Sequence, residues 1–544
     1  MQPLLPHQTH DQAKRRSQLE NYREIYKFDY VFLNGIPFLD HVPKHEYFSL
    51  KYWIERLGSF MTMPGNLVVA RILSLIKPMK SPYDFSRLFI FETEPEIGKH
   101  WTSNEAFNNQ RNWGCNPQAL RLMDEMPYGM KLDDRDASDV LKTETSLAEL
   151  LKHKQLYLIE YPELAHIKKG NSWKGRPMTV EAPRAIFAWS AEDKHLYCLG
   201  IQLRPKENGR VFKPTDSEND WLAAKIAFQC ADATHQELGT HFAWTHTVMI
   251  PFAVCTRRQL AKEHPIHIML ESHLTYYLFD NELGRTTFVN PGGPVDRMMG
   301  GSLAESIGAA AEVYHKWNLF DAAHPTELAN RGLDDPENLP DYPFRDDGLL
   351  IWNALGEYVK AYIDLYYPDD QSILDDPELQ AWAYEIASFE ESEMGGKVKG
   401  MPSKIETKTM LTDILQIVIW TMAPLHSMLN FSQWDYIYAP NMPYALYDKI
   451  SETDPISDAD IMNLLPPYSQ AAFQLKWNKI LTSYHYDEFA KYKIPFADEA
   501  AMTVLQNFQA ELEKIENIID KREAGRKIKF PYFKPSLCIN SINT

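Results

Sequence analysis

The chain has 544 residues, of which 44% are hydrophobic and 12% aromatic, and its 56 basic and 74 acidic residues give a formal net charge of −18. This amount of apolar material predicts a large packed core and excludes an intrinsically disordered chain. The acidic balance, without any long run of Lys or Arg, argues against nucleic acid and strongly anionic membranes as partners.

No targeting or membrane-spanning segment is evident. The first 30 residues are polar and mixed in charge, without the apolar stretch and cleavage site of a secretory signal. The best apolar run, residues 67–76, is interrupted by Arg71, which favours a core or interfacial helix over a membrane span. The five cysteines are scattered and include no C-x-x-C pair, as expected of reduced, buried thiols. We expect a cytoplasmic protein that touches a membrane, if at all, only peripherally.

Hydrophobic periodicity predicts a mainly α chain. Residues 1–41 are expected to form a helical extension or linker, followed by one large domain at 42–544. Within the extension, YVFLNGIPFLDH either packs on that domain, which we favour, or makes a weak, shallow membrane contact. The runs YLIEY, AIFAWS and LYCLGIQL predict one small sheet between 156 and 203. Apolar residues at helical spacing predict long helices at 221–252, 347–367, 411–433 and 500–522.

The segment HFAWTH places His241 and His246 five residues apart inside the first of these helices. Positions i and i+5 of a regular α-helix point about 140° apart, so the two rings would not share a face. A π-bulge, which closes an i to i+5 hydrogen bond, would bring both rings to one side, and such bulges are frequent at functional sites. The spacing therefore either has no meaning or predicts a locally distorted helix.

A second apolar helix, LTDILQIVIWTMAPLHSMLNFSQ, carries His426 and, four residues later on the same face, Asn430. Left unpaired in such surroundings, an imidazole and an amide cost several kcal/mol, so either backbone groups or a ligand must satisfy them. A metal ion would satisfy all of these groups together. Three imidazoles suit Fe, Zn, Cu or Ni, and an added amide oxygen and carboxylate point to iron or manganese rather than zinc.

The sequence resembles the lipoxygenases from about Val42 to its last residue. The motifs that carry the resemblance follow the family's order: VPKHEYFS, NNQRNWGCNP, APRAIFAW, WLAAK, ELGTHFAWTH, RRQLAKEHPI, NELGRTTFVNPGG, YPFRDDGLLIW, DPELQAW, IWTMAPLHSMLNFSQ and CINSINT. The resemblance implies a large single helical catalytic domain with its metal between two long central helices. Too few residues precede the first motif for the N-terminal β-sandwich lipid-binding domain of many members. In this respect the chain is similar to short bacterial, cyanobacterial-like lipoxygenases.

The resemblance also implies a ligand set for one non-haem iron, with manganese as the alternative. It comprises three imidazoles, a weakly bound asparagine oxygen and the C-terminal carboxylate, from His241, His246, His426, Asn430 and Thr544. Most members end in isoleucine, or valine in some fungal enzymes; a terminal Thr keeps the carboxylate but weakens the apolar anchoring of the tail. Glu237 and Gln433 are expected around the ligands, with Gln433 hydrogen-bonding towards the asparagine.

The implied activity is that of a dioxygenase acting on a polyunsaturated fatty acid such as linoleate. A metal-bound hydroxide held by these ligands would remove a bis-allylic hydrogen of the 1,4-pentadiene, and the radical would take up O2 to give a hydroperoxide. Gly284, in NELGR, stands where members that form R products have Gly and those that form S products have Ala, which implies an R product. Phe288 occupies the position where family members generally have a leucine that clamps the pentadiene. A bulkier ring there could shift the site of oxygenation, so the resemblance does not predict which carbon is oxygenated. Val295 belongs either to the cavity wall or to the core.

Three alternatives accompany this reading: a catalytically silent lipid-binding relative, a manganese enzyme, and a hydroperoxide isomerase. The complete ligand set argues against the first of these.

Overall fold

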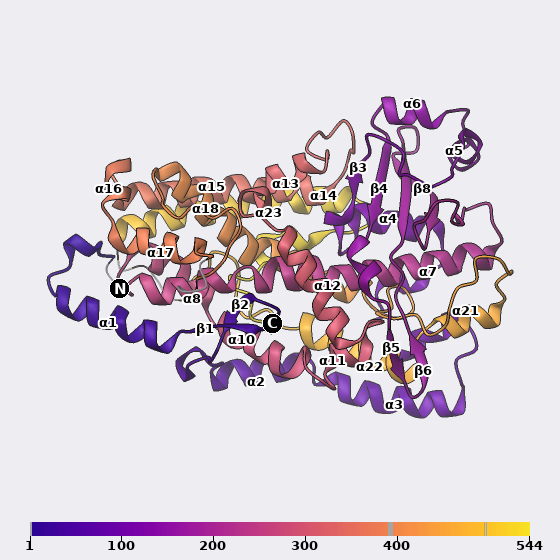
Figure 1. Cartoon of the computed structure of the whole chain (residues 1–544), viewed down its shortest axis with the longest axis horizontal. Helices are drawn as coiled ribbons and strands as arrows, with labels where there is room; N and C mark the ends of the chain where they lie inside the picture. Colours follow the sequence, from indigo (N-terminus) through magenta and orange to yellow (C-terminus); the bar gives the residue numbers. More distant parts are fainter. Residues whose placement is uncertain (1–2, 390–394, 494–495, 497) are drawn as a thin grey trace.

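The structure is a computed structural model that describes residues 3–389, 395–493, 496 and 498–544. Helices dominate it, and Figure 1 shows them filling an elongated molecule, with β3, β4 and β8 gathered beside α4 and α5 at one end. The prediction of a mainly α chain with a small β excursion is confirmed.

Two central helices are each interrupted by a π-helical segment. The first combines α7 (Glu218–His235), the π-helical segment Gln236–Thr247 and α8 (Ile250–Gln259). The second combines α18 (Lys408–Trp420), the π-helical segment Thr421–Leu425 and α19 (His426–Phe431). Both are buried along nearly their whole length, because their apolar residues occupy every face and not a single stripe. The distortion predicted from the histidine spacing is therefore present.

The other helices surround this pair. The longer ones are α1 (Gln12–Ile25), α2 (Leu50–Ser59), α3 (Thr62–Ile76), α4 (Asn104–Trp113), α5 (Asp134–Leu141), α9 (Pro265–Leu274), α12 (Leu303–Lys316), α15 (Gly348–Tyr366), α17 (Pro377–Ala387), α22 (Tyr468–Thr482) and α23 (Glu499–Gly525). The shorter ones are α6 (Leu147–Lys152), α10 (Tyr277–Leu283), α11 (Pro294–Met298), α13 (His324–Asn330), α14 (Pro343–Asp346), α16 (Asp370–Leu374), α20 (Gln433–Tyr436) and α21 (Asp458–Leu464). The helices predicted near 347–367 and 500–522 correspond to α15 and α23.

The predicted sheet is antiparallel, in the order β3-β4-β7-β8. Its strands are β3 (Arg121–Leu122), β4 (Leu156–Glu160), β7 (Arg184–Ser190) and β8 (His195–Gln202). Alternate residues of β7 face two cores: Phe187 packs in the main one, whereas Ile186 packs in a smaller one with residues of α5 and α6. The sheet thus joins a small lobe to the helical body. A separate hairpin pairs β5 (Asn171–Trp173) with β6 (Arg176–Met178).

The segment 1–41, expected to be helical, is helical only in its first part. After α1 it forms a hairpin of β1 (Phe28–Leu33) and β2 (Ile36–Leu39). The two-residue turn Asn34–Gly35 has positive φ at both positions, 52° and 93°, as the tight turns of hairpins require. Local turn chemistry therefore overrides the helical expectation for this part of the segment.

The hairpin packs on the rest of the protein, as favoured from the sequence. Leu33, Ile36 and Phe38 are each no more than 2% exposed and belong to the main core. The helix before it is tied down as well, since the Arg15 guanidinium forms a buried ion pair of 2.6 Å with Glu378. Val31, at 85% exposure, is the large apolar side chain that this hairpin leaves in solvent.

Two stretches are long and apolar enough to cross a membrane by length and composition alone, Lys408–Tyr436 and Leu50–Ile76. The apolar window of the first is 94% buried within the protein, so it is a core helix. The window of the second is only 17% buried. Residues 67–76, expected in a core or interfacial helix, belong to this second, surface-lying stretch.

The five cysteines are all buried and free, as predicted. Burial raises the pKa of each thiol, to about 12 for Cys198. Because the thiolate is the nucleophile and metal ligand, these protonated thiols act as small core side chains.

One buried histidine makes the folded state sensitive to acid. His324 is 1% exposed, its ring lies 4.5 Å from that of Trp420, and burial lowers its pKa from 6.5 to about 3. Because the folded-state pKa is the lower one, the unfolded state takes up the proton first, and stability falls as the pH drops from 6.5 towards 3. This group alone should lower the free energy of unfolding by about 2 kcal/mol between pH 7 and pH 5. Urea unfolding should show that His324→Gln removes this part of the pH dependence; an unchanged pH dependence would contradict the assignment.

Candidate metal centre

Three histidine rings from the two central helices meet in the core. His241 and His246 lie on the π-helical segment 236–247, and His426 directly follows the second π-helical segment. Nε2 of His426 lies 3.3 Å from Nε2 of His241 and 3.2 Å from Nε2 of His246. Within the described part of the chain, these three form the one group of His, Cys, Asp or Glu side chains placed to hold a metal ion.

The three rings cannot satisfy one another by hydrogen bonds alone. Burial and the neighbouring imidazoles hold the pKa of His246 and of His426 well below the usual value, so these rings are neutral. A neutral imidazole has one N–H and one lone pair, so Nε2 of His426 cannot pair fully with two other nitrogens at once. Nitrogens about 2.1 Å from one metal and about 90–110° apart lie about 3.0–3.4 Å from each other. The two measured distances fall in that range.

Asn430 leaves an unused oxygen beside the cluster. Its amide Nδ2 donates to the Leu481 carbonyl at 3.0 Å and to Oγ1 of Thr544 at 3.1 Å. Its Oδ1 is buried and has no hydrogen-bond partner among the described residues. An acceptor in this state is costly unless a further group binds it. The amide is therefore oriented so that its oxygen is available to a ligand.

The C-terminal tail is buried and held by polar contacts. Thr544 is 4% exposed and lines the same cavity as His241 and His246. The Tyr52 hydroxyl donates to the Asn543 carbonyl, and Nη1 of Arg56 donates to the same oxygen at 3.2 Å. Helix α2 thus fixes the residue next to the terminus. Sequence reasoning missed this pair; the signal was a tyrosine and an arginine four residues apart, and therefore on one face of the helix.

A carboxylate and two amides surround the outer nitrogen of His241. Nε2 of Gln433 donates to Glu237 at 2.8 Å and to Gln236 at 3.0 Å, and lies 3.2 Å from Nδ1 of His241. Oε2 of Glu237 lies 3.4 Å from the same Nδ1. The bond expected from Gln433 towards Asn430 is absent here, because Gln433 begins α20 after the helix breaks at Ser432 and its amide lies beside the π-helical segment instead. Gln236 was not foreseen.

An apolar cavity of about 310 Å³ adjoins the cluster. The three residues predicted to position substrate or oxygen, Gly284, Phe288 and Val295, all line it. Further lining residues are Trp53 and Leu57 of α2, Phe60 directly after α2, and Trp477 of α22. The rings of Phe288 and Trp477 meet edge to face with centroids 5.5 Å apart. A methyl group built on Gly284 meets no atom within 4 Å, so close packing does not require glycine there.

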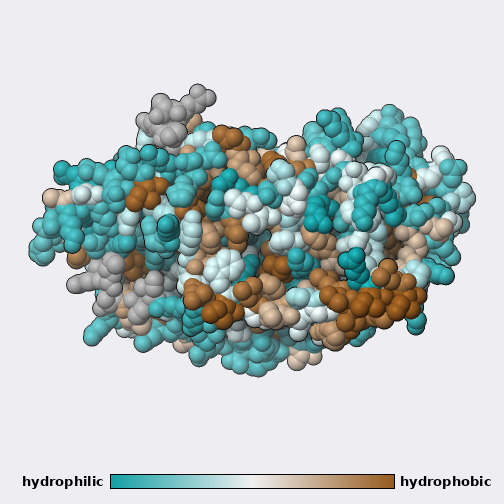
Figure 2. All heavy atoms as spheres, turned by 90° about the horizontal axis from the view of Figure 1, so that it is seen from below, coloured by the Kyte–Doolittle hydropathy of each residue, from teal (hydrophilic) through white to brown (hydrophobic). Residues whose placement is uncertain are grey.

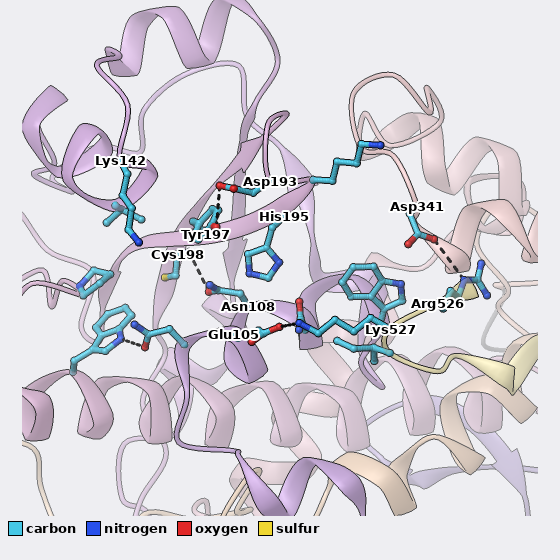
Figure 3. Close-up of a pocket in the computed structure, with 18 of the residues that line it drawn as sticks. Glu105, Asn108, Lys142, Asp193, His195, Tyr197, Cys198, Asp341, Arg526 and Lys527 are labelled. Atoms are coloured by element: carbon cyan, nitrogen blue, oxygen red, sulfur yellow. Dashed lines mark hydrogen bonds and ion pairs between the residues drawn. The ribbon is translucent and has the colours of Figure 1, made fainter. Parts of the chain in front are cut away.

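A second hollow is polar and lies away from the cluster. It measures about 980 Å³, between β8 and the end of α23 (Figure 3). Two pairs of its charged residues neutralise each other, Lys527 with Glu105 and Arg526 with Asp341. The hollow includes none of the three clustered histidines. The apolar cavity is therefore the candidate site.

Comparisons with known proteins agree on one family. The family model described as Lipoxygenase matches residues 66–532. The chain is 30% identical over 472 residues to the linoleate 9/13-lipoxygenase of Pseudomonas aeruginosa, covering 82% of this chain and 68% of that protein. It is 28% identical over 548 residues to the human polyunsaturated fatty acid lipoxygenase ALOX15B, covering 98% and 80%. The crystal structure of coral 8R-lipoxygenase superposes with a TM-score of 0.90 at 26% identity, covering 100% of this chain and 83% of that one.

Proposed function

Because the chain belongs to the lipoxygenase family, a family of dioxygenases, we propose that it inserts O2 into polyunsaturated fatty acids that contain a 1,4-pentadiene. One observation carries the proposal: three buried imidazoles converge beside an apolar cavity, which His241 and His246 line. Such a cavity takes up an acyl chain, and the cluster places a metal at one point along it. The product is a fatty acid hydroperoxide.

We propose that the metal is a non-haem iron. The three imidazoles, the free oxygen of Asn430 and the carboxylate of Thr544 would hold it, a mixed nitrogen and oxygen set that fits iron or manganese better than tetrahedral zinc. Bound there, iron supplies one-electron chemistry for removal of a bis-allylic hydrogen. Glu237 beside Nδ1 of His241 favours the tautomer whose proton is on Nδ1, which leaves Nε2 free to bind.

The cavity residues orient the acyl chain. Phe288 and Trp477 form an aromatic wall, and Val295 is buried in the same lining, so the chain is held by shape and not by polar contacts. Arg56 also lines the cavity and carries a permanent positive charge, but that charge is already paired with Asp280, whose Oδ1 lies 3.5 Å from Nη1 of Arg56. Apolar walls also keep water away from the carbon radical that reacts with O2.

Oxygen uptake tests the proposal. Iron-loaded protein should consume O2 with linoleate and not with oleate, which has no bis-allylic carbon. An oxygen electrode detects every regiochemistry, including a product without a conjugated diene. No uptake from protein shown to contain iron would favour the silent lipid-binding relative; uptake restored only by manganese would identify the metal as manganese.

Gly284 is proposed to direct O2 to the face of the pentadienyl radical that gives an R product. The open space around its Cα is room that a methyl group would take from oxygen. Gly284→Ala should therefore reverse the major enantiomer, as measured by chiral chromatography of the reduced product. Gly308→Ala in α12, where a methyl also meets no atom within 4 Å, is the matched control and should leave chirality unchanged. An unchanged R excess in Gly284→Ala would refute this role, and an S product from the wild type would do so directly.

A further inference from the structure

One face of α2 and α3 exposes a row of large apolar side chains to solvent. They recur every three or four residues between 50 and 61 and again between 68 and 75, with Ile76 added directly after. Each is between 48% and 79% exposed, and they comprise Leu50, Ile54, Leu57, Met61, Val68, Ile72, Leu75 and Ile76. We call this set the apolar stripe. Figure 2 shows hydrophobic residues gathered along the part of the surface where α2 and α3 lie in Figure 1.

The inner face of the same helices is fixed to the protein. Tyr52 and Arg56 of α2, and Met63, Asn66 and Ala70 of α3, are buried. Both helices therefore lie flat on the molecule and present the stripe outward. This is the arrangement of an interfacial amphipathic helix and not of a membrane span. Isolated exposed apolar residues are ordinary, but a continuous stripe marks a binding surface.

The charge around the stripe is opposite to that of the chain. Apart from the buried Arg56, residues 50–91 hold five Lys or Arg and two Asp or Glu, whereas the whole chain has 56 and 74. Lys51, Arg71, Lys77 and Lys80 are exposed on or next to the two helices. The whole-chain charge argues against anionic membranes, but attraction to a surface acts over about 10 Å and depends on the local charge.

The stripe and the cavity share a helix. α2 contributes Trp53 and Leu57 to the cavity lining, and Leu57 is at the same time 48% exposed as part of the stripe. One side of α2 therefore faces the cavity and another faces solvent. A lipid held against the stripe lies next to the cavity wall.

We propose that the apolar stripe docks on the surface of a bilayer that contains anionic phospholipids. The apolar side chains enter the boundary between headgroups and acyl chains, and the four basic residues meet the headgroups. The docked protein then takes its acyl substrate from the bilayer past α2. The identity of that substrate rests on the proposed function, whereas the docking itself does not.

Vesicle flotation tests the docking. Vesicles of dioleoyl phosphatidylcholine, with and without dioleoyl phosphatidylglycerol, contain no bis-allylic carbon, so binding is independent of turnover. The wild type should bind the anionic vesicles, and Ile72→Gln/Leu75→Gln should lower the ratio of bound to free protein at least about tenfold. Leu365→Gln/Ile518→Gln, which changes two exposed apolar residues of α15 and α23, should bind as the wild type does. Lys77→Gln/Lys80→Gln should weaken binding to the anionic vesicles only.

Two further measurements separate the outcomes. Neither Ile72 nor Leu75 lines the cavity, so oxygen uptake with dissolved linoleate should stay within about twofold of wild type in that variant. If the wild type binds vesicles but consumes no O2 with linoleate, the proposed function is rejected and the docking stands. Equal vesicle binding by wild type and the α3 variant would overturn the docking. The docking would also be overturned if the wild type formed a dimer and bound no vesicles, and if Ile72→Gln/Leu75→Gln made it monomeric. The stripe would then be an interface between two copies of the chain.

Discussion

Replacing His426 with glutamine is expected to abolish stoichiometric iron binding and to lower oxygen uptake with linoleate by at least about a thousandfold. His426 is the ring that lies within 3.3 Å of both other imidazole nitrogens, so its loss removes the nitrogen that joins the two halves of the cluster. Glutamine keeps much of the side-chain volume, which limits the cavity left in a core where His426 is fully buried. Iron content by mass spectrometry of the purified protein, together with the oxygen electrode, gives both readouts.

The matched control is His324→Gln. His324 is equally buried and lies against Trp420, in the helix that leads to His426, but it is outside the cluster. This control should keep its iron and its activity while losing some stability. If His426→Gln retained one iron per chain, the cluster would not be the metal centre. If both variants lost iron equally, the effect would be one of folding and the assignment would lose its support.

Local patterns predicted the long central helices and three strands of the sheet, because these elements depend on local physics. The strands β4, β7 and β8 and the long central helices follow directly from apolar spacing. The hairpin of β1 and β2 was missed although Asn34–Gly35 is a strong turn signal. Pro37, within β2, weakens the strand pattern since it cannot donate to a ladder.

The π-helical segments of the two central helices differ in how far the sequence reveals them. The first is visible because His241 and His246 can share a site only if the helix is distorted. The second, Thr421–Leu425, leads to a single histidine, so no pair of side chains reports the distortion. It includes Pro424, whose missing N–H leaves one carbonyl without its usual donor. That feature is compatible with several kinds of helix irregularity.

Contacts distant in sequence could not be predicted from local patterns. Arg56 reaches the carbonyl of Asn543, 487 residues further along the chain, and neither residue signals the other. The outward face of α3 is a similar case. The run 67–76 is equally compatible with a buried helix and an exposed one, and only the packing of Met63, Asn66 and Ala70 decides which face is turned inward.

Glu237→Gln is expected to weaken iron binding by about 10- to 100-fold while leaving the fold intact. The carboxylate accepts a bond of 2.8 Å from Gln433 and lies 3.4 Å from Nδ1 of His241, where it can accept the ring proton. An amide of the same shape accepts less strongly, and its NH2 group opposes that proton, so the ring is no longer fixed with Nε2 directed to the metal. Competition with a chelator measures the affinity, and oxygen uptake at saturating iron separates binding from turnover.

Glu163→Gln provides the comparison because Glu163 is also 4% exposed and also lies near a histidine, 3.7 Å from Nε2 of His235, which is outside the cluster. If Glu237 acts through His241, only Glu237→Gln loses affinity, and excess iron restores most of its activity. If the carboxylate matters only for packing, both variants lose stability alike and their iron affinity stays that of the wild type. Excess iron that fills the site without restoring activity would instead place Glu237 in the reaction itself, beyond its effect on the ring.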